Sequence, residues 1–325
     1  MVRLLKDNRG FALILTILIT SLLVFLTLQF NISMRSDLFG AARLRKGTML
    51  SYVARSGFES ALALLYQDAQ DTEYDSLDEE WANSRVLSEY SGEMFEQGRF
   101  EVQINDQSGK IQINALVDKN GKVDSRQQDV LTRFLGSEVF GLDPEEVGNL
   151  IDAITDWMDP DNEVTRFGAE DSYYRSLPQP YPCKNGPLEV LEELLLVRGM
   201  TRTLFYGGEQ RPGLSDYLTV YGNGEVNINT APPLVLKALS EQIEPYMVQS
   251  MVQYRKEEPD KLADPKWYKQ VTGMDNVSIE PEIITTKSTT FEILSKGLEA
   301  PMTVEIAAVV ERKEKSLKLL SWKTQ

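Results

Sequence analysis

An uncharged apolar segment near the N-terminus, residues 11–34, limits what this chain can fold into more than any other feature. The segment is rich in Leu, Ile, Val and Phe, and it contains no Asp, Glu, Lys or Arg. As an α-helix it would extend about 36 Å at ~1.5 Å per residue, which is enough for the roughly 30 Å hydrocarbon core of a bilayer. Because buried helices of soluble proteins rarely run this long without a charge, we expect a transmembrane helix.

The residues that flank this segment do not orient it by charge. Basic residues lie on both sides, so the positive-inside rule gives no decision; they are Arg3, Lys6 and Arg9 before it, and Arg35, Arg43, Arg45 and Lys46 after it. A secretory signal would be followed by small residues in an A-x-A-like pattern, whereas this sequence reads "QFNISMRSDLFG". We therefore expect the apolar segment to remain on the chain as an anchor.

The composition excludes several classes of function. The chain has 325 residues, a formal net charge of −15 and a charged fraction of 26%. This length predicts two folded parts beyond the anchor, and the negative charge argues against nucleic-acid binding, which needs a cationic face. The chain contains no histidine, which removes Ser-His-Asp chemistry and His-ligated zinc sites. One cysteine, Cys183, allows no intrachain disulfide. We expect a protein that is not an enzyme.

The order of the expected elements indicates a helical block inserted into a strand-rich domain. Apolar residues at steps of three and four continue the first helix to about residue 67, and period-two runs at 98–105 and 109–117 predict strands. Helices are expected from about 118 to 282, including one over "GPLEVLEELLLVRGM". Two octapeptides in this part, "GKIQINAL" and "GEVNINTA", resemble one another. Strands return at 288–298, 302–313 and 317–324.

Two of the expected helices form a pair joined by a short turn, over "NINTAPPLVLKALS" and "EPYMVQSMVQYRKEE". This pair resembles helix-hairpin-helix or sterile-alpha-motif units. Such units often bind DNA, but this pair lacks a basic, glycine-rich hairpin. Contact with another protein is the better interpretation.

The stretch "DWMDPDNEVTRFGAEDSYY", residues 156–174, is the strongest candidate for a chemical site. Carboxylates at positions 1, 3, 5 and 12 of an EF-hand loop converge on one calcium ion, because the loop curls around it. With Asp159 at position 1, those positions hold Asp161, Glu163 and Glu170. Val164 stands where the EF-hand needs Gly, so we predict a calcium loop of related logic. Asp171 is an expected further ligand, and Asp156 could face the same side.

Other interpretations of these acidic residues stay open. They could form a solvated acidic loop, although carboxylates held close together without a cation would repel one another. A glycosidase-like carboxylate pair is the enzymatic alternative, but the sequence around it predicts no sugar cleft. Zinc is disfavoured without histidine, and magnesium would need fewer protein oxygens in a tighter octahedral geometry.

The N-terminal residues resemble the signal of type IV prepilins. That signal is a short basic leader, then Gly10 and Phe11, then an apolar helix. In this family a prepilin peptidase cuts on the cytoplasmic side, after the glycine, and methylates the new N-terminal amine. The resemblance therefore implies a leader over residues 1–10, a transmembrane helix over 11–34, and the bulk of the chain outside the cytoplasm.

One position departs from the usual pilin pattern. Pilins carry Glu at the fifth mature position, where this chain has Leu15. In pilins that Glu is thought to pair with the N-terminal amine of the neighbouring subunit already in the fibre. A subunit with nothing above it does not need the pair. In lacking this Glu, the sequence resembles the minor pseudopilin K family of type II secretion. "GKIQINAL", "YPCKNGPLEVLEELLLVRGM" and "VNINTAPPLVLKAL" also look like segments of that family.

The resemblance implies an α+β fold. It consists of a long N-terminal transmembrane helix, a pilin-like domain with an antiparallel sheet, and a large all-α insertion that is SAM-like or helix-hairpin-helix-like. The pilin-like domain would take residues 35–117 and 286–325, and the insertion residues 118–285. The resemblance also implies bound Ca²⁺ in the insertion.

The resemblance further implies where the chain works and with what. Its partners would be minor pseudopilins I and J at the tip of the major pseudopilin fibre. The chain would be a single-pass protein of the bacterial inner membrane with its C-terminal domain in the periplasm. The alternative is a membrane-anchored periplasmic enzyme or binding receptor whose anchor happens to follow Gly-Phe.

Overall fold

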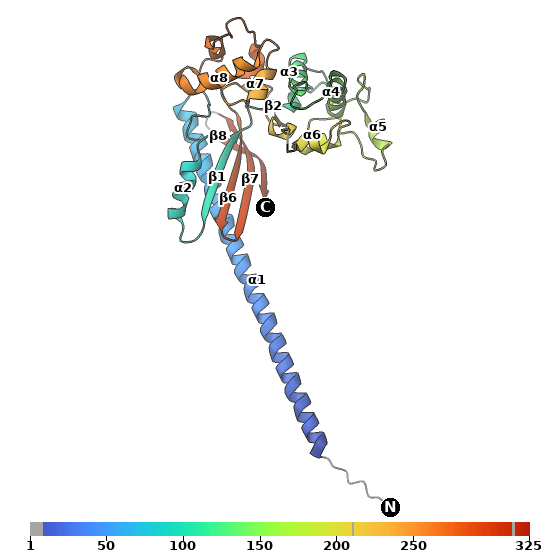
Figure 1. The fold of residues 1–325 in the computed structure, drawn as a ribbon, viewed down its shortest axis with the longest axis vertical. Helices are drawn as coiled ribbons and strands as arrows, with labels where there is room; N and C mark the ends of the chain where they lie inside the picture. The colour runs from blue at the N-terminus through green and yellow to red at the C-terminus, as the bar shows by residue number, and fades with distance from the viewer. Residues whose placement is uncertain (1–8, 210, 314–315) are drawn as a thin grey trace, which may run out of the picture.

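The computed structural model describes residues 9–209, 211–313 and 316–325. Most of the expected leader, residues 1–8, lies outside the described residues. Helix α1 (Arg9–Asp71) begins just before the expected cleavage point. It is one continuous helix that projects from a folded body as a long stalk (Figure 1). The apolar window of this helix is 0% buried, with a mean hydropathy of 2.7. The prediction of one long helix that continues from the apolar segment into a packing element is therefore confirmed, and its exposed apolar half is long enough to cross a membrane.

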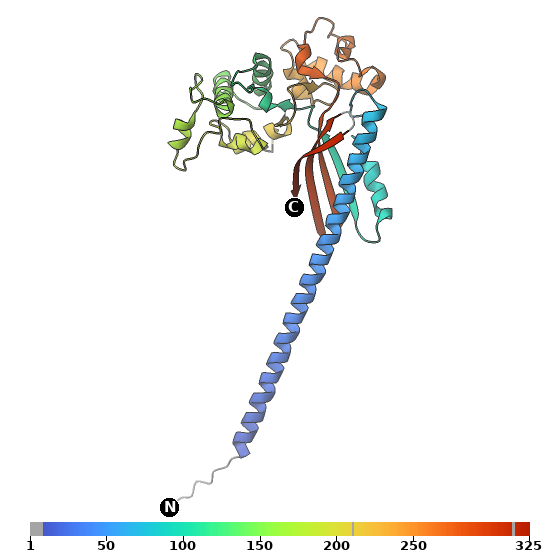
Figure 2. The same ribbon diagram turned by 180° about the vertical axis from the view of Figure 1, so that it is seen from behind.

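The second half of α1 packs against a four-stranded antiparallel sheet (Figure 2). The strand order is β1-β6-β7-β8, from β1 (Arg99–Asp106), β6 (Thr290–Glu299), β7 (Met302–Lys313) and β8 (Ser316–Thr324). The three C-terminal strands were predicted from their alternation. β1 and β6 are far apart in the sequence but are neighbours in the sheet. The insertion that lies between them in the chain therefore leaves the sheet at the end of β1 and returns to it at the start of β6.

Two glycines permit the close approach of α1 to this sheet. A Cβ at Gly57 would lie 2.5 Å from Ser295 Oγ, and a Cβ at Gly297 would lie 2.2 Å from the carbonyl oxygen of Leu50. Alternate sheet residues and one face of α1 form a shared core around Ala54, Phe58, Phe100, Ile293 and Ile306. Helix α2 (Arg85–Met94) runs beside β1 and completes this part.

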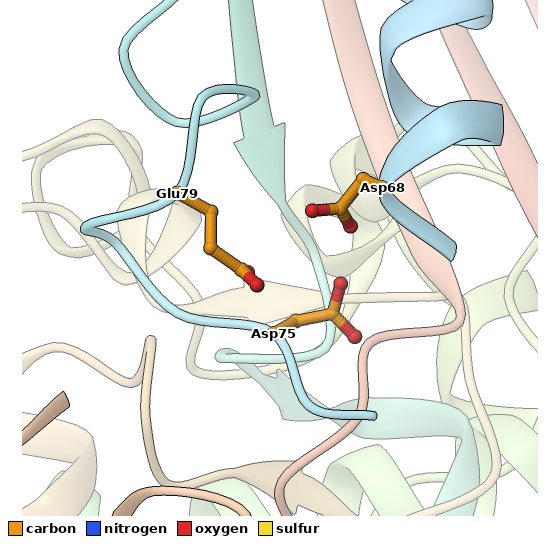
Figure 3. A group of neighbouring side chains, drawn as sticks. All are labelled: Asp68, Asp75 and Glu79. Atoms are coloured by element: carbon orange, nitrogen blue, oxygen red, sulfur yellow. The ribbon is translucent and has the colours of Figure 1, made fainter. Parts of the chain in front are cut away.

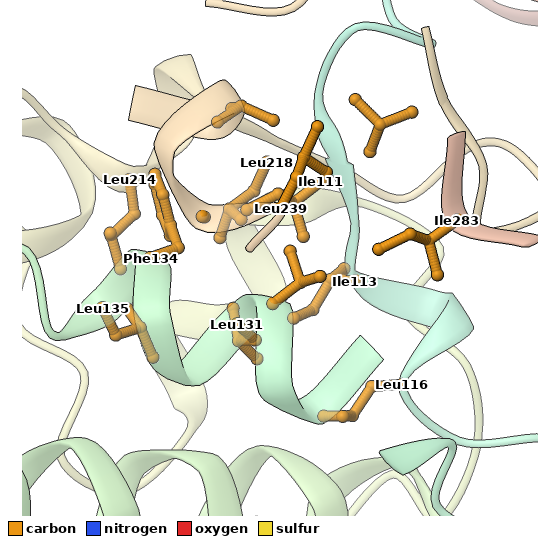
Figure 4. Close-up of a cluster of buried hydrophobic side chains, with 14 of the residues drawn as sticks. Ile111, Ile113, Leu116, Leu131, Phe134, Leu135, Leu214, Leu218, Leu239 and Ile283 are labelled. Atoms are coloured by element: carbon orange, nitrogen blue, oxygen red, sulfur yellow. The ribbon is translucent and has the colours of Figure 1, made fainter. Parts of the chain in front are cut away.

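The insertion forms a separate hydrophobic core at the end of the sheet away from the free end of α1 (Figure 1). Its helices are α3 (Ser125–Leu135), α4 (Pro144–Met158), α5 (Asp171–Arg175), α6 (Arg202–Tyr206), α7 (Pro233–Ala238) and α8 (Pro245–Glu257). Short 3-10 helices connect them: η1 (Ile113–Ala115), η2 (Leu191–Leu196), η3 (Leu214–Asp216), η4 (Pro259–Lys261), η5 (Trp267–Gln270) and η6 (Pro281–Ile283). Figure 4 shows side chains such as Leu131 and Phe134 of α3 facing Ile111 and Leu218 in this core.

The insertion is helical as predicted, except for two short parallel ladders. β2 (Ile111–Gln112) pairs with β3 (Leu218–Thr219), and β4 (Val226–Asn227) pairs with β5 (Ile284–Thr285). β2 and β4 lie in the two octapeptides that resemble one another, so this likeness reflects one local structure used twice. The α+β class is confirmed.

Two expected elements are corrected. The strand over 109–117 is limited to β2, because the polar residues of its alternation are buried or half-buried and bonded to distant backbone groups. Gln112 Nε2 donates to Glu225 O at 2.6 Å, and Asn114 Nδ2 donates to Leu188 O at 2.9 Å. The helix expected over 186–200 is only η2, because Gly199 adopts a left-handed φ of 88° and Val190 is extended. The few residues between them suit a short 3-10 turn.

Candidate metal centre

The predicted acidic loop runs between two helices. Helix α4 starts with a capping box, in which Asp143 accepts from the backbone N–H of Glu146 and the Glu146 side chain accepts from that of Asp143. It ends at its C-cap Asp159, and Glu170 is the N-cap of α5. Asp156 lies in the last turn of α4, which contains no basic residue. Carboxylates at a helix C-terminus face its partial negative charge, so this placement is unfavourable without a nearby cation.

The loop brings together the three carboxylates of Asp156, Asp159 and Glu170. One oxygen from each residue lies within 4.8 Å of the others, and the three residues are 0%, 5% and 2% exposed. Asp159 Oδ1 and both carboxylate oxygens of Glu170 are buried without a hydrogen-bond donor. Since buried polar atoms in proteins are almost always paired, these three oxygens are available to coordinate a cation.

The electrostatics of this group point the same way. Burial, together with the charges of Asp156 and Asp159, raises the pKa of Glu170 to about 7. Burial likewise raises the pKa of Asp159 to about 6, with the charges of Asp161 and Asp156 adding to the effect. The pKa of Asp156 is also raised, mainly by burial. The loop therefore holds negative charge at an energetic cost that a bound cation would remove.

Neighbouring residues hold the Asp156 carboxylate and the backbone of the loop in place. The backbone N–H of Thr165 donates to Asp156 Oδ1 at 3.1 Å. A Cβ at Gly168 would lie 2.1 Å from Asp156 Oδ2, so only glycine fits against this carboxylate. Asn185, in a left-handed conformation with φ 47°, donates from its side chain to the carbonyl oxygen of Asp161.

The other expected ligands lie outside this buried group. Asp161 and Glu163 are exposed, and Asp161 Oδ1 accepts from the backbone N–H of Glu163 at 2.8 Å. Asp171 forms an ion pair with Arg175, at 2.5 Å, and accepts from the backbone N–H of Cys183 at 3.1 Å. Of the five expected ligands, the structure thus brings together Asp159 and Glu170.

Three residues that shape the carboxylate group are not among the ligands predicted from the spacing: Asp156, Gly168 and Asn185. Asp156 lies before the EF-hand-like register, so its side-chain direction depends on the last turn of α4. Its position three residues before Asp159 on the same helix face was the available signal. Gly168 and Asn185 could not be found from spacing, because their roles depend on contacts across the loop.

A second carboxylate group lies where α1 meets the loop that follows it. Asp68, Asp75 and Glu79 converge there (Figure 3). This group contains its own cation, because Arg312 pairs with Asp68 at 2.8 Å and also with Asp75. Glu79 Oε2 accepts from the backbone N–H of Ser76 and from Trp81 Nε1. We therefore treat it as a structural ion-pair network.

The donor set at Asp156, Asp159 and Glu170 consists of carboxylate oxygens, which suit a hard cation such as Ca²⁺ or Mg²⁺. The exposed neighbours Asp161 and Glu163, together with water, could supply further oxygens of the six to eight that Ca²⁺ takes. The residues present therefore fit the cation that the sequence predicted.

Among the described residues of the N-terminal signal, Gly10, Phe11 and Leu15 lie on the exposed surface of α1. A Cβ at Gly10 would meet no atom within 4 Å. Phe11 is 71% exposed and Leu15 is 45% exposed. The identities of these residues are therefore not explained by the fold of the single chain.

Comparison with known proteins gives one consistent family. Two family models described as type II secretion system, protein K match residues 109–207 and 226–284. Type II secretion system protein K of Aeromonas hydrophila is 26% identical over 70% of this chain and 69% of its own length. The protein of the same name from Klebsiella pneumoniae is 28% identical over 70% and 67%. That from Pseudomonas aeruginosa is 27% identical over 77% and 73%.

The fold is also that of a solved relative. The structure of the GspK-GspI-GspJ complex from enterotoxigenic Escherichia coli contains a chain that matches with a TM-score of 0.65 at 18% identity. The match covers 88% of this chain and 99% of the solved one. The chain spans about two thirds of the length of the curated relatives it matches. Family models, relatives and fold all point to one family, protein K of the type II secretion system.

Proposed function

We propose that this chain caps the tip of the type II secretion pseudopilus together with minor pseudopilins I and J, and so supports protein export across the outer membrane. The observation that carries this proposal is the position of the insertion. It lies at the end of the sheet farthest from the free end of α1 (Figures 1 and 2). In a fibre whose subunits pack by their α1 helices, this body occupies the space where the next subunit would stack.

The anchor supports the same assignment. The apolar part of α1 is wholly exposed in the single chain, so its burial must come from lipid, from other subunits, or from both. Leu15 removes the carboxylate that would otherwise pair with a neighbour's amine. A carboxylate in hydrocarbon costs several kcal/mol unless it is paired. A subunit at the tip, with no subunit above it, therefore avoids the cost of an unpaired carboxylate by having Leu at this position.

Tip labelling tests the capping function. An epitope tag inserted at the exposed turn of Asp275 and Asn276 would be bound by gold-conjugated antibody on sheared pseudopili. We expect gold at one end of each fibre. Labels distributed along the fibre would contradict the cap, and purified fibres without any label would contradict incorporation.

Processing by prepilin peptidase follows from the same proposal. The chain would be cut between Gly10 and Phe11, methylated on the Phe11 amine, and held in the inner membrane with its folded body in the periplasm. Intact-mass measurement of the protein extracted from membranes that contain the peptidase would then lack residues 1–10 and carry one added methyl group. A full-length mass would favour the alternative of an anchored enzyme or receptor.

We also propose that the loop from Asp159 to Glu170 binds Ca²⁺. Asp156, Asp159 and Glu170 would hold the ion, with Asp161 and Glu163 at its exposed side. When bound, the ion supplies the positive charge that offsets the repulsion of these carboxylates. These residues connect the end of α4 to the start of α5. We therefore expect calcium binding to make this part of the insertion more rigid, and we expect no chemical reaction at the site.

A further inference from the structure

The insertion contains two units that share one order of elements. Each unit begins with a short strand, continues through a pair of helices, and ends with a strand that pairs in parallel with the first one. The first unit, residues 109–219, has strands β2 and β3 and the helix pair α3 and α4. The second unit, residues 224–285, has strands β4 and β5 and the helix pair α7 and α8. Comparing the units shows which parts of the first one the shared fold requires.

An asparagine after the first strand holds the same part of the chain in both units. In the first unit, Asn114 Nδ2 donates to Leu188 O at 2.9 Å, and Asn114 Oδ1 accepts from Leu188 N at 2.8 Å. In the second unit, Asn229 Nδ2 donates to Leu262 O at 3.1 Å. Each leucine is followed by a 3-10 helix, η2 or η5, and then by a glycine with a left-handed φ; the glycines are Gly199 and Gly273. The two leucines are therefore equivalent positions.

The units differ in the chain that connects the second helix to this leucine. Helix α8 ends at its C-cap Glu258, and only residues 259–261 separate it from the leucine. Helix α4 ends at its C-cap Asp159, and residues 160–187 separate it from the leucine. Because the second unit closes with the short connection, the shared fold does not require the long one. We call residues 160–187 the added segment.

The metal centre lies at the seam between the added segment and the rest of the first unit. Glu170 belongs to the segment, whereas Asp156 and Asp159 belong to the end of α4. An ion bound by these three carboxylates would therefore tie the segment to the helix. Without an ion, like charges face one another across the seam and push the segment away from α4.

The second unit meets the charge of the corresponding helix end with its own side chains. The last turn of α8 carries Arg255 and Lys256, and cations there offset the partial negative charge of a helix C-terminus. The last turn of α4 carries no basic residue. The negative charge at the end of α4 is therefore left for a bound ion to offset.

Packing contacts define the closed position of the added segment. The Tyr174 ring meets Trp157 of α4 edge-on, with centroids 4.9 Å apart, and the Tyr174 hydroxyl accepts from Arg198 N at 3.2 Å. Cys183 Sγ donates to Asp156 O at 3.6 Å, and Cys183 is 8% exposed. These contacts oppose the repulsion at the seam, and a bound ion would remove that repulsion.

We infer that release of calcium lets the repulsion of these carboxylates open the added segment, while the shared parts of both units stay folded. This inference rests on the proposed calcium site, and it adds which part of the insertion the ion controls. That part is a surface segment whose helix α5 lies at the outer end of the insertion (Figure 1).

Labelling of the single cysteine tests this opening, because Cys183 lies in the added segment. The full-length chain in detergent would react with a maleimide either in calcium or in EDTA. An ion that binds only the closed segment lowers the open fraction by a factor of 1 + [Ca²⁺]/Kd. At a calcium concentration of about 100 times Kd, we therefore expect labelling of Cys183 to be about a hundredfold slower than in EDTA.

A cysteine in the second unit provides the matched control. Ser240, between α7 and α8, is 8% exposed, as Cys183 is. Cys183→Ser with Ser240→Cys should therefore be labelled slowly in calcium and in EDTA alike. Fast labelling of this variant in EDTA would mean that the second unit opens as well, and it would overturn the inference.

A charge variant tests the cause of the opening. Asp159→Asn with Glu170→Gln removes the repulsion at the seam, so Cys183 in this variant should be labelled slowly even in EDTA. Labelling as fast as that of the wild type in EDTA would show that repulsion does not open the segment, and the inference would be wrong.

The melting temperature separates this inference from the proposed calcium site. If calcium raises the melting temperature of the wild type but leaves the labelling rate of Cys183 unchanged, the chain binds calcium and the inference is wrong. If calcium changes neither quantity, the calcium site itself is wrong, and the inference fails with it.

Discussion

Asp68, near the end of α1, is a half-buried carboxylate whose ionisation the fold opposes. Burial raises its pKa from 3.8 to about 7, and the charges of Glu79 and Asp75 add to this against the opposing effect of Arg312. A raised pKa means that the folded chain holds the proton more tightly than the unfolded chain does. The resulting stabilisation is fully present below about pH 4 and is lost as the pH rises through about 7.

We therefore expect Asp68→Asn to reduce the pH dependence of stability. With calcium saturating, the melting temperature of the wild type should fall between pH 5 and pH 8. The fall should be smaller in the variant by on the order of 3 °C. Asp71→Asn, at the exposed end of the same helix, is the control and should follow the wild type. Parallel curves for all three proteins would show that Asp68 does not titrate in this range.

The buried carboxylates of the proposed calcium loop should stabilise the fold when calcium is bound and destabilise it when calcium is removed. Calcium should stabilise the wild type by about 4 kcal/mol at a thousandfold excess over Kd. Asp159→Asn with Glu170→Gln should abolish this gain, and in chelator it should melt at or above the wild type, because the repulsion is gone. Melting curves with EDTA, Ca²⁺ and Mg²⁺ measure this.

The matched control for the loop is Asp260→Asn, an exposed carboxylate elsewhere in the insertion. It should keep the calcium response. If the wild type melts at the same temperature in EDTA and in calcium, the loop does not bind calcium and the proposal is wrong.

At the scale of elements, the uncharged apolar run predicted the first half of α1, and periodicity predicted its second half and strands β6, β7 and β8, because each of these has one apolar and one polar face. It failed where polar side chains are buried or half-buried. In β2 and after it, Gln112 and Asn114 point into the protein and bond to distant backbone groups, so alternation there did not indicate a half-exposed strand. At the metal centre, spacing found Asp159 and Glu170. It could not find Gly168, whose role depends on its contact with Asp156.

Helix α2 illustrates a contact that sequence pattern alone does not reveal. The hydroxyls of Ser88 and Ser91 accept from the N–H groups of Val102 and Phe100 at the edge of β1. Ser88→Ala with Ser91→Ala would leave these N–H groups without acceptors, at about 1–3 kcal/mol for each buried group. We expect a melting temperature lower by roughly 5 °C, with concentration-dependent self-association as the β1 edge becomes free. Differential scanning calorimetry and size-exclusion chromatography measure the two effects.

Ser250→Ala is the control for α2, because the Ser250 hydroxyl donates back to Tyr246 O of its own helix. Its stability and oligomeric state should match the wild type. If the double variant also melts as the wild type does, the serines are not what closes this edge.

At the scale of the whole molecule, the two cores suggest how capping can be separated from assembly. The chain leaves the sheet at Gln107 and returns at Thr290, and these residues are joined by a backbone hydrogen bond of 2.9 Å. A short linker could therefore replace most of the insertion. The sheet and α1 would keep their own core, which is built from residues outside the insertion.

We expect this shortened chain to bind minor pseudopilins I and J but to cap poorly, because the body that blocks stacking is gone. Pseudopili assembled with it should be longer than those assembled with the wild type, as measured by electron microscopy of sheared fibres. Retained binding of I and J shows that the shortened chain has folded. Fibres of unchanged length, made with a shortened chain that still binds I and J, would mean that Leu15 or another feature of α1, and not the bulk of the insertion, ends the fibre.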